Sequence, residues 1–164
     1  MSEDRFLIGF SVLRRLRLLI SRHMPSFQPD PEILALGVRQ PWVELILRGI
    51  KTIEVRSQDT QVRGTIYLYA SKKLSDFPAA IEAARRHKLD CDSLPLGVLV
   101  GSVEIAATRP TVPRDESAAC IPAAMLKRNF AWQLRNAQRF TSPLPVRFLP
   151  YGVWFYPFRR RRAE

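Results

Sequence analysis

The chain has few cysteines and histidines, the residues on which disulfide frameworks and zinc sites depend. Cys91 and Cys120 lie far apart, without a CxxC pair or a Cys/His pattern. His23 and His87 also lack a partner at the spacing of zinc ligands. We therefore expect no metal, no other cofactor and no disulfide framework, and two reduced thiols are typical of a cytoplasmic protein.

Long hydrophobic runs are also missing. No stretch of 18 consecutive apolar residues occurs, and arginines interrupt the apolar residues near the N-terminus. A transmembrane helix needs about 20 predominantly apolar residues, and a signal peptide needs an uninterrupted apolar core. We expect neither of them in this chain.

Positive charge is what the chain has in excess. The 164 residues carry a formal net charge of +11 and give a pI near 10.6. Clustered Lys and Arg residues gain affinity for polyanions by releasing counterions from phosphates. We therefore expect RNA, another nucleic acid or a nucleotide as the partner, although charge alone does not separate these from an anionic membrane surface.

The chain length fits one domain with a hydrophobic core and short appendages. Residues 6–23 place arginines on one helical face and apolar residues largely on the other, which predicts a basic amphipathic helix. The prolines of MPSFQPDPE then mark a linker. We expect an arm at 1–29, a folded domain at 30–158 and a basic tail at 159–164, and the arm is a candidate contact for a protein or a membrane surface.

Alternating apolar and polar residues predict several short strands separated by helices. Helices are expected at 39–51 and 77–87, and a loop at 110–122. Strands are expected at 33–38, 52–56, 64–70, 97–110, 130–140, 146–149 and 151–158. This order predicts an α+β fold: a small, mostly antiparallel β-barrel flanked by two or three helices, with the basic N-terminal helix outside it.

One segment combines signals for the start and the end of a helix with charged residues at fixed spacing. It reads RQPWxxLIxxGxKxxExR over residues 39–56. Pro41 suits the first turn of a helix and Gly49 its C-terminal cap, so the chain should turn there and Lys51 should project toward a ligand. Trp42 has the apolar helical spacing of a core residue, and we also assign Trp132 and Trp154 mainly to the core.

Glu54 and Arg56 share parity on the extended segment after this turn, so both side chains should point to one face. They can form a structural ion pair. Alternatively, Glu54 accepts hydrogen bonds from a base edge while Arg56 binds a phosphate or stacks on a base. Ser71 and Lys72 end a strand, where they either face the same cleft or form an ordinary turn.

The ordered series of motifs along residues 34–156 resembles the ASCH domains of the PUA-like superfamily. The segment described above is followed by Arg63-Gly64 before a strand, Ala70-Ser71-Lys72, GVLVGSVEI, Phe130-Ala131-Trp132 and Gly152-Val153-Trp154. The resemblance implies a PUA-like barrel with a cleft beside the first helix, where the GxKxxExR segment lies. It also implies a role in nucleic-acid binding.

Several activities are known among proteins that this chain resembles. ASCH domains are thought to act in RNA metabolism or in transcriptional coactivators, and some members have ribonuclease activity or hydrolyse acylated cytidine. In the cytidine branch, a nucleophilic threonine stands three residues after the motif lysine, where this chain has Glu54. Thr52 should point to the opposite side of the extended chain and cannot simply replace it, so the resemblance does not extend to this activity.

Our leading hypothesis is a nucleic-acid-binding module with a positively charged cleft. The cleft is expected to contain Arg39, Lys51, Glu54, Arg56, Ser71 and Lys72. The alternative is a hydrolytic enzyme, a ribonuclease or a nucleoside amidohydrolase-like protein, in which Lys51 and Glu54 form the general acid/base pair in the same cleft. The sequence leaves both hypotheses open, together with the oligomeric state.

Overall fold

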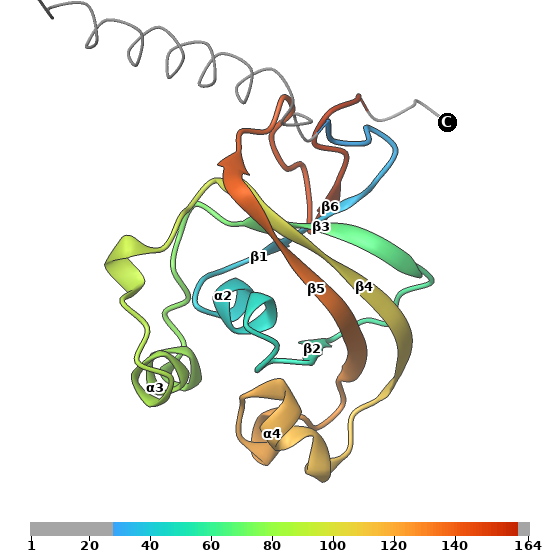
Figure 1. Ribbon diagram of the computed structural model, residues 1–164. Coiled ribbons are helices and arrows are strands. Elements are labelled where there is room, and N and C mark those ends of the chain that lie inside the picture. Colours follow the sequence, from blue (N-terminus) through green and yellow to red (C-terminus); the bar gives the residue numbers. More distant parts are fainter. Residues whose placement is uncertain (1–27, 161–164) are drawn as a thin grey trace, which may run out of the picture.

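A computed structural model describes residues 28–160 and shows a six-stranded sheet curved into a half-barrel (Figure 1). The strands are β1 (Ala35–Val38), β2 (Ile53–Arg56), β3 (Gly64–Ala70), β4 (Val98–Pro110), β5 (Phe130–Leu144) and β6 (Trp154–Phe155). Their order is β2-β5-β4-β3-β1-β6; β1 and β3 pair in parallel, and the other neighbours pair antiparallel. The predicted α+β fold with a mostly antiparallel, barrel-like sheet is confirmed.

Three α-helices accompany the sheet within the described residues. They are α2 (Trp42–Leu47), α3 (Pro78–Arg86) and α4 (Glu116–Ala119), and three 3-10 turns are η1 (Cys91–Ser93), η2 (Pro113–Asp115) and η3 (Ala123–Met125). Figure 1 shows α3 and α4 at the same end of the sheet, below α2 in this view. No helix between residues 28 and 160 is long and apolar enough to cross a membrane. The helix expected at 6–23 lies outside the described residues.

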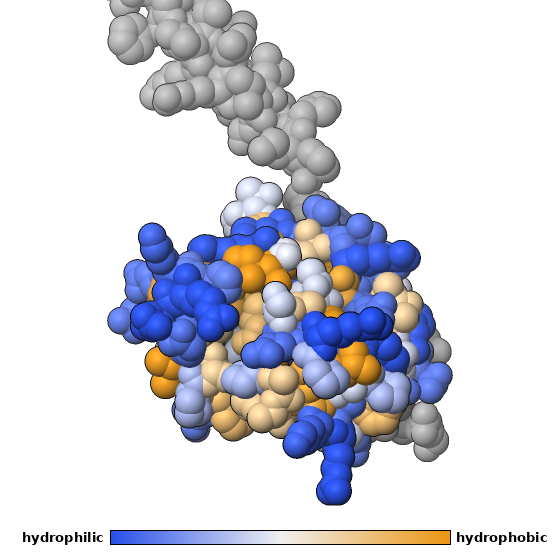
Figure 2. Space-filling model, turned by 90° about the horizontal axis from the view of Figure 1, so that it is seen from below, coloured by the Kyte–Doolittle hydropathy of each residue, from blue (hydrophilic) through white to orange (hydrophobic). Residues whose placement is uncertain are grey.

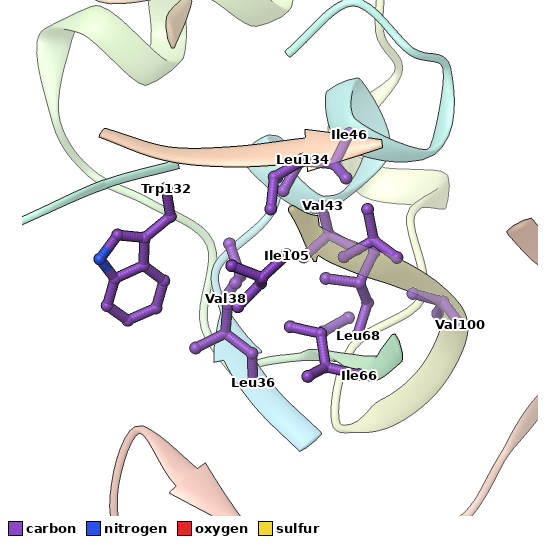
Figure 3. Close-up of a cluster of buried hydrophobic side chains, with 12 residues drawn as sticks. Leu36, Val38, Val43, Ile46, Ile66, Leu68, Val100, Ile105, Trp132 and Leu134 are labelled. Carbon is purple, nitrogen blue, oxygen red and sulfur yellow. The ribbon is translucent and has the colours of Figure 1, made fainter. Parts of the chain in front are cut away.

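The main core lies between α2 and the concave side of the sheet. The buried side chains of Val43 and Ile46 on α2 pack with Leu68 of β3, Ile105 of β4 and Leu134 of β5 (Figure 3). Residues three apart share one face of a helix, and alternate residues share one face of a strand. The apolar periodicity of the sequence therefore assembles this core directly.

Gly101 of β4 allows α2 to approach the sheet closely. A Cβ atom at this position would lie 2.6 Å from Cδ2 of Leu47 and 2.3 Å from the carbonyl oxygen of Gln138 on β5. Both distances are far below van der Waals contact, so any side chain at position 101 would displace α2 or β5.

Side-chain contacts connect the region between the two edge strands, β2 and β6, which do not pair with each other in the sheet. Trp132 of β5 stacks on Trp154 of β6 with ring centroids 5.5 Å apart. Arg56 of β2 donates from Nη2 to the carbonyl oxygen of Gly37 on β1 at 3.2 Å, and its guanidinium lies 5.7 Å from the Trp132 ring centre. Trp132 is buried and Trp154 packs against the core, which confirms their assignment.

The structure corrects two of the expected elements and shortens the strand expected at 151–158 to Trp154–Phe155. Residues 110–122, expected as a loop, contain η2 and α4. Residues 146–149, expected as a strand, form none, because the N–H groups of Arg147 and Phe148 both donate to the carbonyl oxygen of Pro157. In both segments, the conformation depends on contacts that the sequence pattern does not reveal.

Candidate functional site

The turn after α2 positions the motif segment. Pro41 occupies the N-cap of α2, and Gly49 follows its C-cap with φ +70°. Glycine adopts this left-handed conformation without steric cost, so the helix ends where the sequence predicts. The N–H group of Lys51 then donates to the carbonyl oxygen of Leu45 at 3.0 Å, which folds the chain back under the helix.

Lys51 points into the protein. Its side chain is 3% exposed, and Nζ donates to the carbonyl oxygens of Ile53 and Ala119 at 2.8 Å each. Nζ also lies 3.5 Å from Glu54 Oε2 and 5.2 Å from the centre of the Trp42 ring. Lys51 lies inward and not on an exposed turn, because two carbonyl oxygens of the fold accept hydrogen bonds from its Nζ and Glu54 lies close to it.

Burial makes Lys51 an unusual lysine. Desolvation lowers its pKa below the ordinary value of 10.5, and the nearby Glu54 carboxylate acts in the opposite direction. A buried ammonium is costly unless it is paired and hydrogen-bonded. Here the partners come from β2 and α4, and the N–H group of Thr52 also donates to the carbonyl oxygen of Ala118 at 2.9 Å. Lys51 therefore fixes α4 beside β2.

Glu54 lies between two cations. The residue is 6% exposed, and its Oε1 lies 2.9 Å from Arg56 Nε while its Oε2 faces Lys51. The ion pair expected between Glu54 and Arg56 is therefore present, although the Nε–H bond is not aligned for a hydrogen bond. A carboxylate has about four acceptor positions, so Glu54 keeps capacity for a ligand after both ion pairs are formed.

A pocket of about 220 Å³ has Lys51 and Glu54 in its lining, and their burial places them at its floor. The other lining residues come from four separate segments and are Trp42, Val55, Phe77, Ile121, Met125 and Asn129. Pockets for drug-sized ligands measure about 300–1,000 Å³. This smaller pocket, with aromatic and apolar walls above a carboxylate, suits a single flat ring that carries N–H donors.

Phe77 and Asn129 give the pocket its accessible wall. Phe77 is 57% exposed, so its ring is not used by the core. Asn129 donates from Nδ2 to the carbonyl oxygens of Met125 and Lys127 at 3.0 and 3.2 Å, and no hydrogen bond to its Oδ1 is found among the described side chains. The polar groups that face a ligand are thus mainly acceptors. No group of three His, Cys, Asp or Glu residues between 28 and 160 could hold a metal.

Four of the expected site residues do not line this pocket. Arg39 forms an ion pair with Asp76 at 3.0 Å, and both side chains are exposed. The N–H group of Ser71 donates to the carbonyl oxygen of Val38, as at an ordinary strand end, and Lys72 is exposed. The structure brings Lys51, Glu54 and Arg56 together through ion pairs, but Arg56, like Arg39, Ser71 and Lys72, does not line the pocket.

The sequence did not indicate the pocket residues that lie outside the motif segment. Ile121, Met125 and Asn129 follow α4, and they reach the motif segment only because α4 packs beside β2. Phe77 stands at the start of α3, in a segment predicted as a surface helix. Its one sequence signal is a large aromatic residue directly before the proline that begins a helix.

A family model and solved structures agree with this architecture. The model of the ASCH domain matches residues 36–144, so the chain belongs to the ASCH domain family. The crystal structure of ASCH from Zymomonas mobilis matches with a TM-score of 0.53 and 15% identity, over 77% of this chain and 88% of that chain. A mutant form of the same protein gives a TM-score of 0.52 over 79% and 90% of the two chains. At this identity the likeness shows the fold.

A curated human protein shares part of the sequence. Activating signal cointegrator 1 from Homo sapiens is 34% identical over 77 residues. The matched region covers 43% of this chain and 13% of the human protein. The similarity therefore concerns one segment of a much longer relative.

Proposed function

We propose that the protein binds single-stranded RNA, or a closely related nucleic acid, by taking one base into the pocket above Lys51 and Glu54. The observation that carries this proposal is a buried carboxylate at the floor of a ring-sized pocket that has Trp42 and Phe77 in its walls. Proteins recognise single-stranded bases by stacking them on aromatic side chains and by hydrogen-bonding their edges. Membership of a family thought to bind RNA and the net charge of +11 support the same partner.

The pocket residues have separate roles in this proposal. Glu54 accepts hydrogen bonds from the N–H groups of the base edge, and Trp42 and Phe77 contact the faces of the ring. Lys51 holds the Glu54 carboxylate in place, because its Nζ lies 3.5 Å from Glu54 Oε2. The exposed cations outside the pocket, Arg39 and Lys72, add phosphate contacts that depend on salt.

A hydrolytic function is the second candidate, and one observation favours it. Lys51 is a buried lysine with a lowered pKa beside a carboxylate in a pocket, which is a pattern often found at catalytic sites. Its Nζ, however, is already bonded to the carbonyl oxygens of Ile53 and Ala119. A general base must reach the substrate proton, and Lys51 would have to break these bonds to do so. The geometry supports binding better than catalysis.

Phe77→Ala tests the proposal with Ile81→Ala as its matched control. Both side chains are strongly exposed, at 57% and 62%, and Ile81 does not line the pocket. Base stacking contributes about 1–3 kcal/mol per base, so Phe77→Ala should weaken binding of an unstructured single-stranded RNA about 5- to 150-fold. Ile81→Ala should leave the Kd unchanged in the same fluorescence anisotropy titration at fixed salt. Equal Kd values for both variants and the wild type would contradict the pocket.

The same incubations separate binding from hydrolysis. After titration, the RNA is recovered and its length is measured on a denaturing gel. Intact RNA is the expected result. Fragments that appear with the wild-type chain and disappear with Glu54→Gln would establish the hydrolytic alternative, because that substitution removes the carboxylate and keeps the shape of the side chain.

A further inference from the structure

A groove of about 820 Å³ lies beside the pocket, and α3 and α4 form much of its lining. The two cavities meet at Ile121, which lines both of them. Ile50, Ile121 and Pro122 give the groove apolar surface, and Arg86, His87 and Arg114 add basic groups. Figure 2 shows this end of the molecule, where hydrophobic surface lies between hydrophilic groups.

Arg86 is weakly engaged within the protein. Its Nη2 lies 3.8 Å from Oε1 of Glu82, and the same carboxylate already accepts two hydrogen bonds of 3.0 Å from Arg85. The charge of Glu82 is therefore largely compensated by Arg85, and Arg86 remains available to an anion in the groove.

Arg114 is available as well. It forms no ion pair with any of the residues between 28 and 160, because the adjacent carboxylate of Asp115 is bound by both terminal nitrogens of Arg109 at 2.6 and 2.7 Å. Glu82 and Glu116 also line the groove, and Glu82 is paired with Arg85 from outside the lining. The groove thus combines apolar surface with two arginines that are free to contact an anion.

We infer that this groove holds the nucleotide next to the one whose base occupies the pocket, so that the site takes at least two consecutive nucleotides of one strand. The inference rests on the proposed function, since it assumes that a base enters the pocket. A strand in the pocket must continue into neighbouring space, and the groove adjoins it at Ile121. Apolar surface suits a base or sugar face, and arginines suit the phosphate between two nucleotides.

Cys120 can report directly on occupation of the groove. It is half-buried in the groove lining, with Sγ 3.6 Å from the carbonyl oxygen of Ser117 and 3.9 Å from that of Ile50. Burial raises the pKa of the Cys120 thiol, so alkylation is slow and its rate is easily followed. Cys91 does not line the groove, and Cys91→Ser leaves Cys120 as the single thiol.

The experiment uses the full chain carrying Cys91→Ser, with the nucleosides adenosine and uridine and with oligoadenosine and oligouridine probes of two and four nucleotides. Affinity should rise between one and two nucleotides. Arg86→Ala and Arg114→Ala should each weaken binding of the two-nucleotide probe about two- to fivefold and leave the nucleoside unchanged, as expected for exposed ion pairs. Lys73→Ala removes the same charge from an exposed residue outside the groove. It should leave the affinities for the nucleoside and for the two-nucleotide probe unchanged. Probes of two and four nucleotides, but not the nucleoside, should slow alkylation of Cys120.

Two different results separate failure of this inference from failure of the proposed function. If Phe77→Ala weakens binding of the four-nucleotide probe while both arginine variants keep wild-type affinities and Cys120 stays reactive, the strand leaves the pocket by another path and the inference is wrong. If Phe77→Ala has no effect on the four-nucleotide probe, the pocket itself is not the binding site. Both the proposed function and the inference built on it would then be rejected.

Discussion

Two groups of charged residues, which the sequence places in one cleft, have opposite surroundings in the structure. Lys51 and Glu54 are buried and pair with each other at the floor of a pocket. Arg39 and Lys72 are exposed and lie outside it. Burying a charge is costly without partners, whereas an exposed charge mainly contributes through counterion release. The GxKxxExR segment therefore supplies the buried charges at the floor of the pocket, and residues outside the segment supply most of its walls.

The largest expected effect is on stability, at Lys51. Lys51→Met should lower the free energy of unfolding by about 3 kcal/mol or more, because it leaves Glu54 with one cation and the carbonyl oxygens of Ile53 and Ala119 without their donor. Lys72→Met, the exposed counterpart, should change it by less than about 0.5 kcal/mol. Urea unfolding of the two variants measures the difference. Equal stabilities would show that the contacts of Lys51 contribute nothing to the fold.

A smaller effect is expected at Asp115, which orders the segment before α4. Its carboxylate is buried and accepts two hydrogen bonds from Arg109, with a third from the N–H group of Val112 at 2.9 Å. Asp115→Asn should cost about 2 kcal/mol at neutral pH, the usual contribution of hydrogen bonds to a charged group. Urea unfolding measures this loss, with Asp92→Asn as a control at an exposed position.

The cost of Asp115→Asn should also depend on pH in a defined direction. The hydrogen bonds from Arg109 hold the pKa of Asp115 below its ordinary value of 3.8. A carboxylate with a lowered folded-state pKa stabilises the protein above the ordinary value, and this stabilisation is lost as the pH falls through the folded-state value. The difference between wild type and variant should therefore shrink in acid, below about pH 4. A difference that stays constant down to pH 3 would contradict the role of the Asp115 charge.

The smallest expected effect on stability comes from residues 1–29. Their removal takes away five arginines and two acids, a net loss of three positive charges. The melting temperature should stay unchanged, while the slope of log affinity against log salt should become shallower by about one to three units, at about 0.7 per phosphate contact on a single strand. A melting temperature many degrees lower would mean that the segment belongs to the core. An unchanged slope would mean that its charges never meet the nucleic acid.

Local sequence patterns predict most of the fold correctly. β1 to β4 lie within or close to the expected ranges, and Gly49 ends α2 as expected, because strand alternation and a left-handed glycine are local signals. The short α4 was not predicted, since the bonds between Arg109 and Asp115 that support it are tertiary contacts. The strand expected at 146–149 fails for the same kind of reason, because its N–H groups bind Pro157.

The candidate site is harder to predict from local sequence patterns than the fold is. The spacing of the motif indicates which residues lie beside the first helix, and the ion pair between Glu54 and Arg56 is one of the two arrangements that it allows. It does not indicate which way Lys51 points, because one of its acceptors, Ala119, lies 68 residues away. Charge normally indicates exposure, and only the folded chain shows that this lysine is buried.

The most direct test of the pocket is a crystal structure of the full chain with a single-stranded oligonucleotide of four residues. We predict one base in the pocket between Trp42 and Phe77, with a donor on its edge within hydrogen-bonding distance of Glu54. A strand that lies across Arg39 and Lys72 while the pocket stays empty would contradict the account. It would show that the exposed cations, and not the pocket built by the motif, bind the nucleic acid.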